Sequence, residues 1–527
     1  MKKIIFLVTI FVCLLFAKEE NDLIKMLEYG DTYDFSQRIA NVKDENMKNF
    51  YTAIYYMCSG DYDTAKEYIL KVSSNIKISD QEMFFTKYIL YLAQTFSSGY
   101  EKHESEHFEV YLKDRDRILS EQILKILEQI YKFYGKKFGY YPEKKVRVEV
   151  YNTKEEFSIA STLGEEIIKK TGVVGICKFN RIMILSPECL PFGYRWCDTL
   201  AHEYIHFILN RITNFKYPLY LHEGTARYFD TLYRSTTPLC FVVGNLNLLL
   251  DAAKKNEIIP FEKMKGSLVY LESQQQVELA FVELSTFVEY LINTFGEDKF
   301  IEFVKNYKDY DKEEKLYKEI FGIEFKNILS GWYESIYKKE EYVKRYPGAM
   351  PDFMVTFSED EKSLVGLDMW QYIELGDKFF LNKNYNVALY QYKKAQKQQP
   401  YNPVVMTRIA KCYIMHNKYE DAEKILQECS FVNPNYVPTY ELLVKLFYEK
   451  GEYEKAIRYY EDVLQINPFN WEIHKIVAQM FSDLGKIKDA IKKYEIVLLL
   501  NPADTDAKVK YDNLRRYLEY KNLEYKK

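Results

Sequence analysis

The chain of 527 residues has little excess charge, only seven histidines, and no long apolar run beyond its first 17 residues. Its net charge of -4 argues against a dedicated nucleic-acid surface, so we expect no nucleic-acid partner. None of its cysteines forms a CxxC pair, which disfavours a zinc site built from thiolates. With 47% hydrophobic and 28% charged residues, the composition is that of a globular protein long enough for two or three domains.

The first residues have the pattern of an export signal. Two lysines precede an apolar run from Ile4 to Phe16, and Ala17 stands before a charged segment. We therefore expect residues 1–17 to be a signal peptide and the protein to be exported, either periplasmic or extracellular, or membrane-associated if the signal is retained. The run is shorter than the roughly 20 residues that a bilayer requires, so we expect no transmembrane span in the mature chain.

A period of 34 residues marks the last third of the chain. The recurring positions are Pro400, Pro434, Pro468 and Pro502, together with Ala388, Ala422, Ala456 and Ala490. This period resembles tetratricopeptide repeats and implies an all-α solenoid with units at 369–402, 403–436, 437–470 and 471–504, followed by a capping helix and tail at 505–527. Such arrays offer a groove, so we expect a protein or peptide partner there, unless the repeats only brace the neighbouring domain.

The remaining chain divides by pattern into three parts. Residues 18–100 are expected to form helical hairpins of a degenerate repeat-like kind, because Ala53 and Ala65 stand twelve apart, as Ala410 and Ala422 do in the repeats. Residues 101–345 are expected to form the domain that carries the chemistry. Residues 346–368, which are rich in Pro, Gly and acidic residues, are expected to form a linker.

The pattern HExxH, typical of a zinc-binding helix, occurs twice. Two histidines four apart lie on one face of a helix, and the helix must be buried on its other side to fix them. The copy from His202 to His206 has apolar neighbours, whereas the copy from His103 to His107 contains Glu106 and precedes an alternating, strand-like run. We therefore expect His202 and His206 to bind a metal and HESEH to be a surface approach to a first strand.

A third metal ligand is expected on the next helix. Pro218 breaks the chain, and Glu223 follows in an amphipathic segment seventeen residues after His206. Two histidines and a glutamate leave one position open for water, which is the arrangement of a catalytic zinc. His222, the residue before Glu223, is expected to be a packing residue or to support a metal ligand.

The order LAHEYIH, a break and LHEGTARYFD resembles the gluzincin metallopeptidases, in particular the peptidase-MA-like group of exported bacterial proteins. The resemblance covers roughly residues 105–340 and implies an α+β domain, a small mixed sheet plus the HExxH helix, within a predominantly helical protein. It implies Zn²⁺ held by His202, His206 and Glu223, with Glu203 as the general base. The group usually has Trp at the position of His222, and thermolysin-like members have Asp where Arg227 stands.

The resemblance implies a zinc metallopeptidase that hydrolyses a peptide or protein substrate with a zinc-activated water. It does not place an oxyanion donor; Tyr228 and Tyr233 are the candidates near in sequence, and Arg227 is a further candidate for supporting the site. Two alternatives remain open: a non-catalytic, protease-like scaffold that acts through its repeats, and a structural zinc module. The second is disfavoured because the set has only three protein ligands.

Overall fold

The computed structural model describes residues 39–72, 80–97, 99–265, 268, 271–310, 312–351, 357 and 361–524. The predicted signal peptide and part of the predicted linker lie outside these residues. The chain divides into two compact units, of which the first comprises residues up to 189, 197–241 and 249–339. Among the described helices, none is both long enough and apolar enough to cross a membrane.

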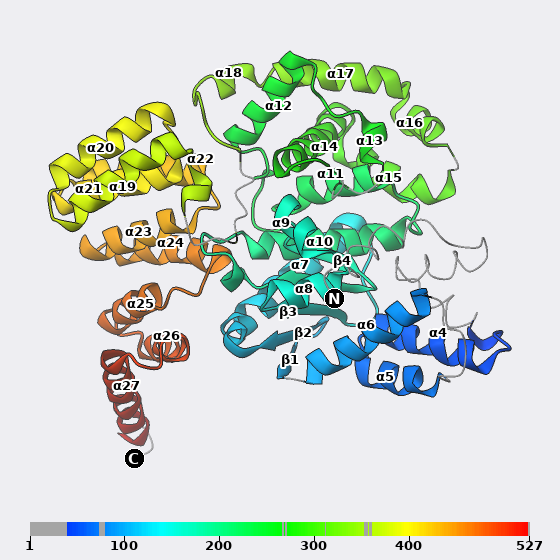
Figure 1. Ribbon diagram of the computed structural model, residues 1–527, viewed down its shortest axis with the longest axis horizontal. Helices are drawn as coiled ribbons and strands as arrows, with labels where there is room; N and C mark the ends of the chain where they lie inside the picture. Colours follow the sequence, from blue (N-terminus) through cyan, green and yellow to red (C-terminus); the bar gives the residue numbers. More distant parts are fainter. Residues whose placement is uncertain are drawn as a thin grey trace. The chain divides into compact units, whose positions relative to one another are not determined.

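Helices outnumber strands in the chain up to residue 343 (Figure 1). Its described elements are, in order, α4 (Glu45–Cys58), α5 (Tyr62–Lys71), α6 (Asp80–Ser97), β1 (Tyr100–Glu104), β2 (Phe108–Lys113), η1 (Asp114–Leu119), α7 (Ser120–Phe138), β3 (Val146–Tyr151), α8 (Lys154–Ser161), α9 (Glu165–Thr171), β4 (Gly175–Lys178), β5 (Arg181–Leu185), η2 (Pro187–Cys189), α10 (Trp196–Ile212), α11 (Leu219–Phe229), α12 (Val243–Lys255), α13 (Phe261–Met264), α14 (Gln274–Phe295), α15 (Glu297–Asn306), η4 (Tyr307–Asp309), α16 (Glu313–Phe321), α17 (Phe325–Tyr337) and α18 (Glu340–Val343).

The strands form one mixed sheet of order β1-β2-β3-β5-β4. The central strands β2, β3 and β5 run parallel, whereas β1 and β4 pair antiparallel at the two edges. Apolar residues alternate with polar ones along β2, while β3 and β5 are buried throughout. Burial of the middle strands on both faces is the usual consequence of helices covering a parallel sheet. The expected α+β domain with a small mixed sheet is thus present.

Helices lie on both faces of the sheet (Figure 1). On one face, the ring of Tyr204 in α10 lies 5.6 Å from that of Phe108 in β2, and Tyr131 of α7 lies 6.2 Å from the same ring. On the other face, Tyr62 of α5 donates a hydrogen bond to Glu149 of β3. The sheet is therefore the middle layer, and one of its faces supports the helix that carries HExxH.

A buried charge network joins the sheet to the N-terminal helices. Glu149 is fully buried and accepts hydrogen bonds from Arg147 Nε at 2.6 Å and from Tyr151 Oη at 2.6 Å. Arg181 Nε lies 3.2 Å from its second oxygen. Burial raises the pKa of a carboxyl group, but the two guanidinium groups outweigh burial and hold the pKa of Glu149 below its usual value.

Glu149→Gln should lower the free energy of unfolding by about 3–5 kcal/mol, because it leaves two buried arginines without a compensating charge. Denaturant unfolding followed by circular dichroism measures the change. The matched control is Glu109→Gln, which breaks the partly exposed pair with Lys102 and should cost less than about 1 kcal/mol. Equal losses in the two variants would contradict this account of the network.

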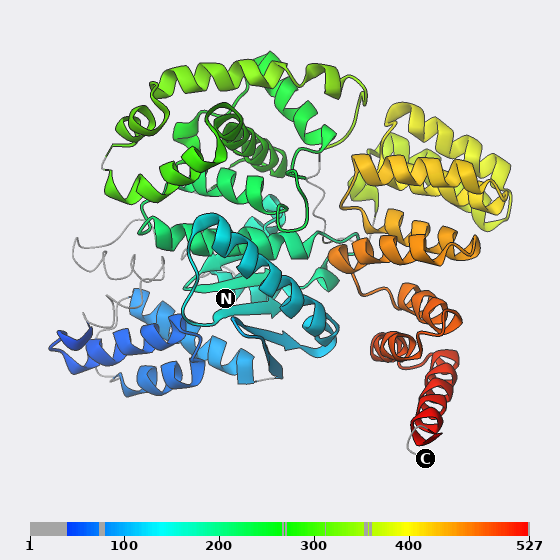
Figure 2. The same cartoon turned by 180° about the vertical axis from the view of Figure 1, so that it is seen from behind.

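The second unit comprises residues 340–527 with two short segments, 190–196 and 242–248. Its helix pairs follow one another along the chain (Figure 2). The four predicted alanines are fully buried, each in the second helix of its pair, so the predicted repeat solenoid is present. Its further elements are η5 (Glu361–Leu364), α19 (Leu367–Leu381), α20 (Tyr385–Gln398), α21 (Pro403–Met415), α22 (Tyr419–Val432), α23 (Val437–Glu449), α24 (Tyr453–Ile466), α25 (Trp471–Asp483), α26 (Ile487–Leu500) and α27 (Thr505–Glu524).

The segment 190–196 is packed into the second unit by several polar contacts. Arg195 donates a hydrogen bond of 2.9 Å to Asp462 and one of 3.0 Å to the carbonyl of Pro434. The indole of Trp196 donates to the carbonyl of Leu464. No sequence pattern predicts these contacts, because they join residues more than 200 positions apart.

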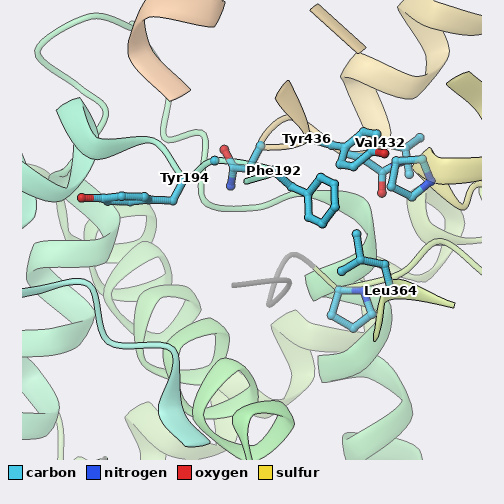
Figure 3. A pocket seen from close by; sticks show the side chains of 10 residues that line it. Phe192, Tyr194, Leu364, Val432 and Tyr436 are labelled. Atoms are coloured by element: carbon cyan, nitrogen blue, oxygen red, sulfur yellow. The ribbon is translucent and has the colours of Figure 1, made fainter. Parts of the chain in front are cut away.

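An apolar pocket lies beside the same segment (Figure 3). The ring of Phe192 stacks on that of Tyr436 with centroids 5.8 Å apart, and Leu364 and Val432 also line the pocket. The aromatic pair and the aliphatic side chains belong to the packed interior of the second unit.

Candidate metal centre

The helix α10 is fixed by burial on the side away from its histidines. Tyr204 and Ile205, the two residues inside the motif, are fully buried. His202 and His206 lie on the opposite face, where their side chains remain 14% and 12% exposed. The spacing of four thus places both imidazoles on one face of the helix, open to a shared ligand.

The helix α11 brings a carboxylate to this face. Its apolar residues Leu221, Ala226 and Phe229 are buried, and it packs against α14. Gly224, next to Glu223, permits the close approach: a Cβ there would lie 2.6 Å from the carbonyl oxygen of Leu284 in α14. A glycine after Glu223 therefore lets the helix that carries it pack tightly against its neighbour.

Three donor atoms converge between α10 and α11. Nε2 of His202 lies 3.1 Å from Nε2 of His206 and 3.3 Å from Oε2 of Glu223. Nε2 of His206 lies 3.5 Å from the same oxygen of Glu223. Ligands of a tetrahedral zinc, at roughly 2.0–2.1 Å from the ion, stand about 3.3 Å apart. The three residues thus fit Zn²⁺, and within the described residues they are the one group of three or more His, Cys, Asp or Glu whose ligand atoms all lie within 4.8 Å of one another.

Asp230 supports His202 from the end of α11. Its Oδ2 lies 3.5 Å from Nδ1 of His202, on the side of the ring away from the other ligands, and the residue is 1% exposed. Arg227, at the position where thermolysin-like members have Asp, contacts Asp230 at 3.4 Å instead. A carboxylate that can orient His202 is therefore present, but it lies three residues later in the sequence than in thermolysin-like members. Comparing only the residue at position 227 with the family misses it.

Glu203 lies beside the edge strand β4. It is 6% exposed, and the backbone of Cys177 in that strand partly offsets the effect of burial on its pKa. A Cβ on Gly175 would lie 2.9 Å from Oε1 of Glu203 and 2.5 Å from Cγ2 of Thr199, so the strand can approach the carboxylate only with glycine there. Burial raises the pKa of Glu203 above its usual value, which suits a group that accepts and returns a proton.

The other candidate residues lie around this centre. His222 is buried, and its Nδ1 lies 3.2 Å from Nδ1 of His206. Tyr233 donates its hydroxyl to Asp198, and Tyr228 packs against Phe229 with ring centroids 5.0 Å apart. Neither tyrosine contact involves the three converging residues, so the oxyanion donor remains a prediction.

The charges of the cluster are strongly coupled. Burial disfavours the charged form of His202, but hydrogen bonds to Asp230 and Glu223 outweigh it and raise its pKa to about 10. Burial likewise disfavours ionised Glu223, yet His206 and His202 hold its pKa well below the usual range. Burial, followed by the charge of His206, lowers the pKa of His222 to about 3 and keeps it neutral.

The second HExxH copy forms part of a hairpin. The alternating run after the motif forms a strand, β2, as predicted, but it is the second strand: His103 already lies in β1, so the motif is not an approach to the first strand. Nδ1 of His107 lies 2.8 Å from Glu128, and its ring stacks on Tyr131. The two histidines therefore belong to a strand and a turn rather than to one helix face.

Comparisons with known families agree with this architecture. A sequence profile of the Peptidase MA superfamily matches residues 128–338, and two tetratricopeptide-repeat profiles match 379–446 and 439–468. The chain has a Peptidase MA superfamily domain followed by tetratricopeptide repeats. The Peptidase MA match includes both α10 and α11. No curated protein matches the chain.

Several solved structures are similar to part of the chain. A structure of MamA is 15% identical over 29% of this chain and 85% of its own, with a TM-score of 0.26. YrrB, described as a repeat protein with an unusual peptide-binding site, is 15% identical over 30% of this chain and 80% of its own, also at 0.26. A thermophilic repeat protein of Thermus thermophilus is 18% identical over 28% of this chain and 98% of its own, at 0.21. Likenesses at such TM-scores say nothing about the partner of this chain.

Zinc binding to the Peptidase MA domain should release about one proton per ion from His202 at pH 7.5, because zinc binds neutral imidazole and this histidine is protonated below its raised pKa. Zinc affinity should accordingly rise as the pH rises towards about 10. Calorimetry in buffers of different ionisation enthalpy measures the released protons. Asp230→Asn removes the negative partner and should reduce the release; an unchanged value would contradict the role given to Asp230.

Proposed function

We propose that the chain is an exported, zinc-dependent metallopeptidase. The observation that supports it most is the convergence of His202, His206 and Glu223 beside a buried Glu203 within the domain matched by the Peptidase MA superfamily. Three protein ligands leave one coordination position open, as in catalytic rather than structural zinc sites. Export rests on the N-terminal sequence pattern.

The reaction is hydrolysis of a peptide bond. His202, His206 and Glu223 would hold Zn²⁺, which would supply a Lewis acid for the attacking water and the scissile carbonyl group. Glu203 accepts the proton of the attacking water and returns it to the leaving amine. The close approach of β4, which Gly175 permits, keeps the strand against the Glu203 carboxylate.

The repeats bind a protein or peptide partner, which is the usual function of a tetratricopeptide array of this size. A non-catalytic scaffold that acts through these repeats alone is the weaker alternative. It gives no reason to keep a buried carboxylate such as Glu203 beside two imidazoles, where burial makes its ionisation costly.

Glu203→Gln should retain zinc and lose at least about 10²-fold in peptide cleavage, because the amide keeps the shape of the side chain but cannot accept the proton. Metal content is measured by atomic spectroscopy and cleavage with a fluorogenic peptide library. Equal cleavage by the purified wild type and Glu203→Gln would refute the assignment of the general base.

His202→Ala and Glu223→Ala should each lose both the bound metal and the activity, since each removes one of three ligands. The matched control is His103→Ala, which disrupts the second HExxH copy in β1 and should keep wild-type zinc content. Chelation of the wild type should abolish cleavage, and added Zn²⁺ should restore it. A wild-type protein that holds no zinc after loading would refute the metal site itself.

A further inference from the structure

His222 has a contact with the metal cluster that its sequence position does not explain. It precedes Glu223 on α11, and its side chain turns towards α10, where Nδ1 lies 3.2 Å from Nδ1 of His206. The two rings stand 5.4 Å apart at an angle of 34°, and the ring of Tyr217 packs edge-on at 5.3 Å. The residue is only 5% exposed, so water does not readily replace this contact.

The number of lone pairs on an imidazole decides which nitrogen carries the proton in His206 and in His222. His206 turns Nε2 towards Nε2 of His202 and Oε2 of Glu223, so Nε2 is its ligand atom. A neutral imidazole whose Nε2 lone pair is given to a metal carries its proton on Nδ1. The short contact to His222 then requires a lone pair on Nδ1 of His222, and the proton of His222 lies on its Nε2.

We propose that His222 is the positioning residue of His206: its Nδ1 accepts the hydrogen bond from Nδ1–H of His206 and fixes the tautomer that presents Nε2 to the metal. The proposal rests on the zinc site of the proposed function but not on peptide cleavage. His222 touches no reacting atom, and it acts through the ligand that it orients.

The two ligand histidines are thus supported by different chemistry. His202 has the carboxylate of Asp230 behind it, at 3.5 Å, whereas His206 has a neutral imidazole at 3.2 Å. A hydrogen bond to a carboxylate is charge-assisted and stronger than one between neutral groups. Loss of such outer partners typically costs 10–100-fold in metal affinity, so the contribution of His222 is measurable.

The test compares two substitutions at this position in the full chain. His222→Leu retains much of the volume but has no acceptor, whereas His222→Asn offers an amide oxygen near the place of Nδ1. The zinc dissociation constant is measured with zinc alone, by competition with a chromogenic chelator. We expect about 10–100-fold weaker binding for His222→Leu and a value within about threefold of wild type for His222→Asn.

His474→Leu is the matched control. His474 is also buried and hydrogen-bonded, to Tyr460 and the carbonyl of Pro468, but it lies in the repeats. This variant should bind zinc as the wild type does. Such a result would show that weaker binding in His222→Leu comes from the lost hydrogen-bond acceptor and not from the removal of a buried histidine as such.

Three results would overturn the proposal: wild-type affinity in folded His222→Leu, equally weak binding by both substitutions at position 222, or loss of affinity in the His474 control. If His222→Leu does not fold, nitrogen chemical shifts of ¹⁵N-histidine in the zinc-loaded wild type decide. They should show His206 protonated on Nδ1 and His222 on Nε2, and the reverse assignment would overturn the proposal. A wild type that binds zinc here without cleaving peptides removes the proposed function and leaves this inference standing.

Discussion

The structure of the candidate site depends on one packing constraint, the burial of α10 and α11 against the layers on either side of them. Bringing two imidazoles and a carboxylate close together removes water from around these polar groups, which costs free energy. They stay together only if the backbone that carries them is held in place. Here α10 is held by the sheet through Tyr204 and Phe108, and α11 is held by α14 through the close contact at Gly224. Rigid elements thus preorganise the three donors.

The sheet contributes to the chemistry as well as to the support. Its edge strand β4 runs beside α10, and the absence of a side chain at Gly175 lets the strand reach the carboxylate of Glu203. On the opposite face of the sheet, Glu149 pairs with Arg147 and Arg181 of the central strands and accepts a hydrogen bond from Tyr62 of α5, which joins the N-terminal helices to the sheet. Helices α4, α5 and α6 are therefore part of the same compact unit as the candidate metal centre.

Much of the architecture was readable from local pattern. The 34-residue period located the repeats, because each helix pair must bury the same small residue where its helices meet. The spacing of four between His202 and His206 placed both on one face, because a helix turns every 3.6 residues. The charged interior of HESEH argued against a second zinc helix, and β1 and β2 occupy that region. The family spacing pointed to position 227 for an orienting carboxylate and so missed Asp230.

The sequence by itself determined which residues could share a helix face and which part of the chain carries helical repeats, since both follow from regular spacings along the chain. Only the tertiary structure decided that Glu223 stands 3.3 Å from His202, that Asp230 rather than a residue at position 227 supports that histidine, and that His222 faces His206. Each of these contacts joins α10 to α11 or to the residue that ends it, so their distances are set by the packing of α11 against its neighbours. No local pattern encodes such packing, because it depends on side chains far apart in the chain.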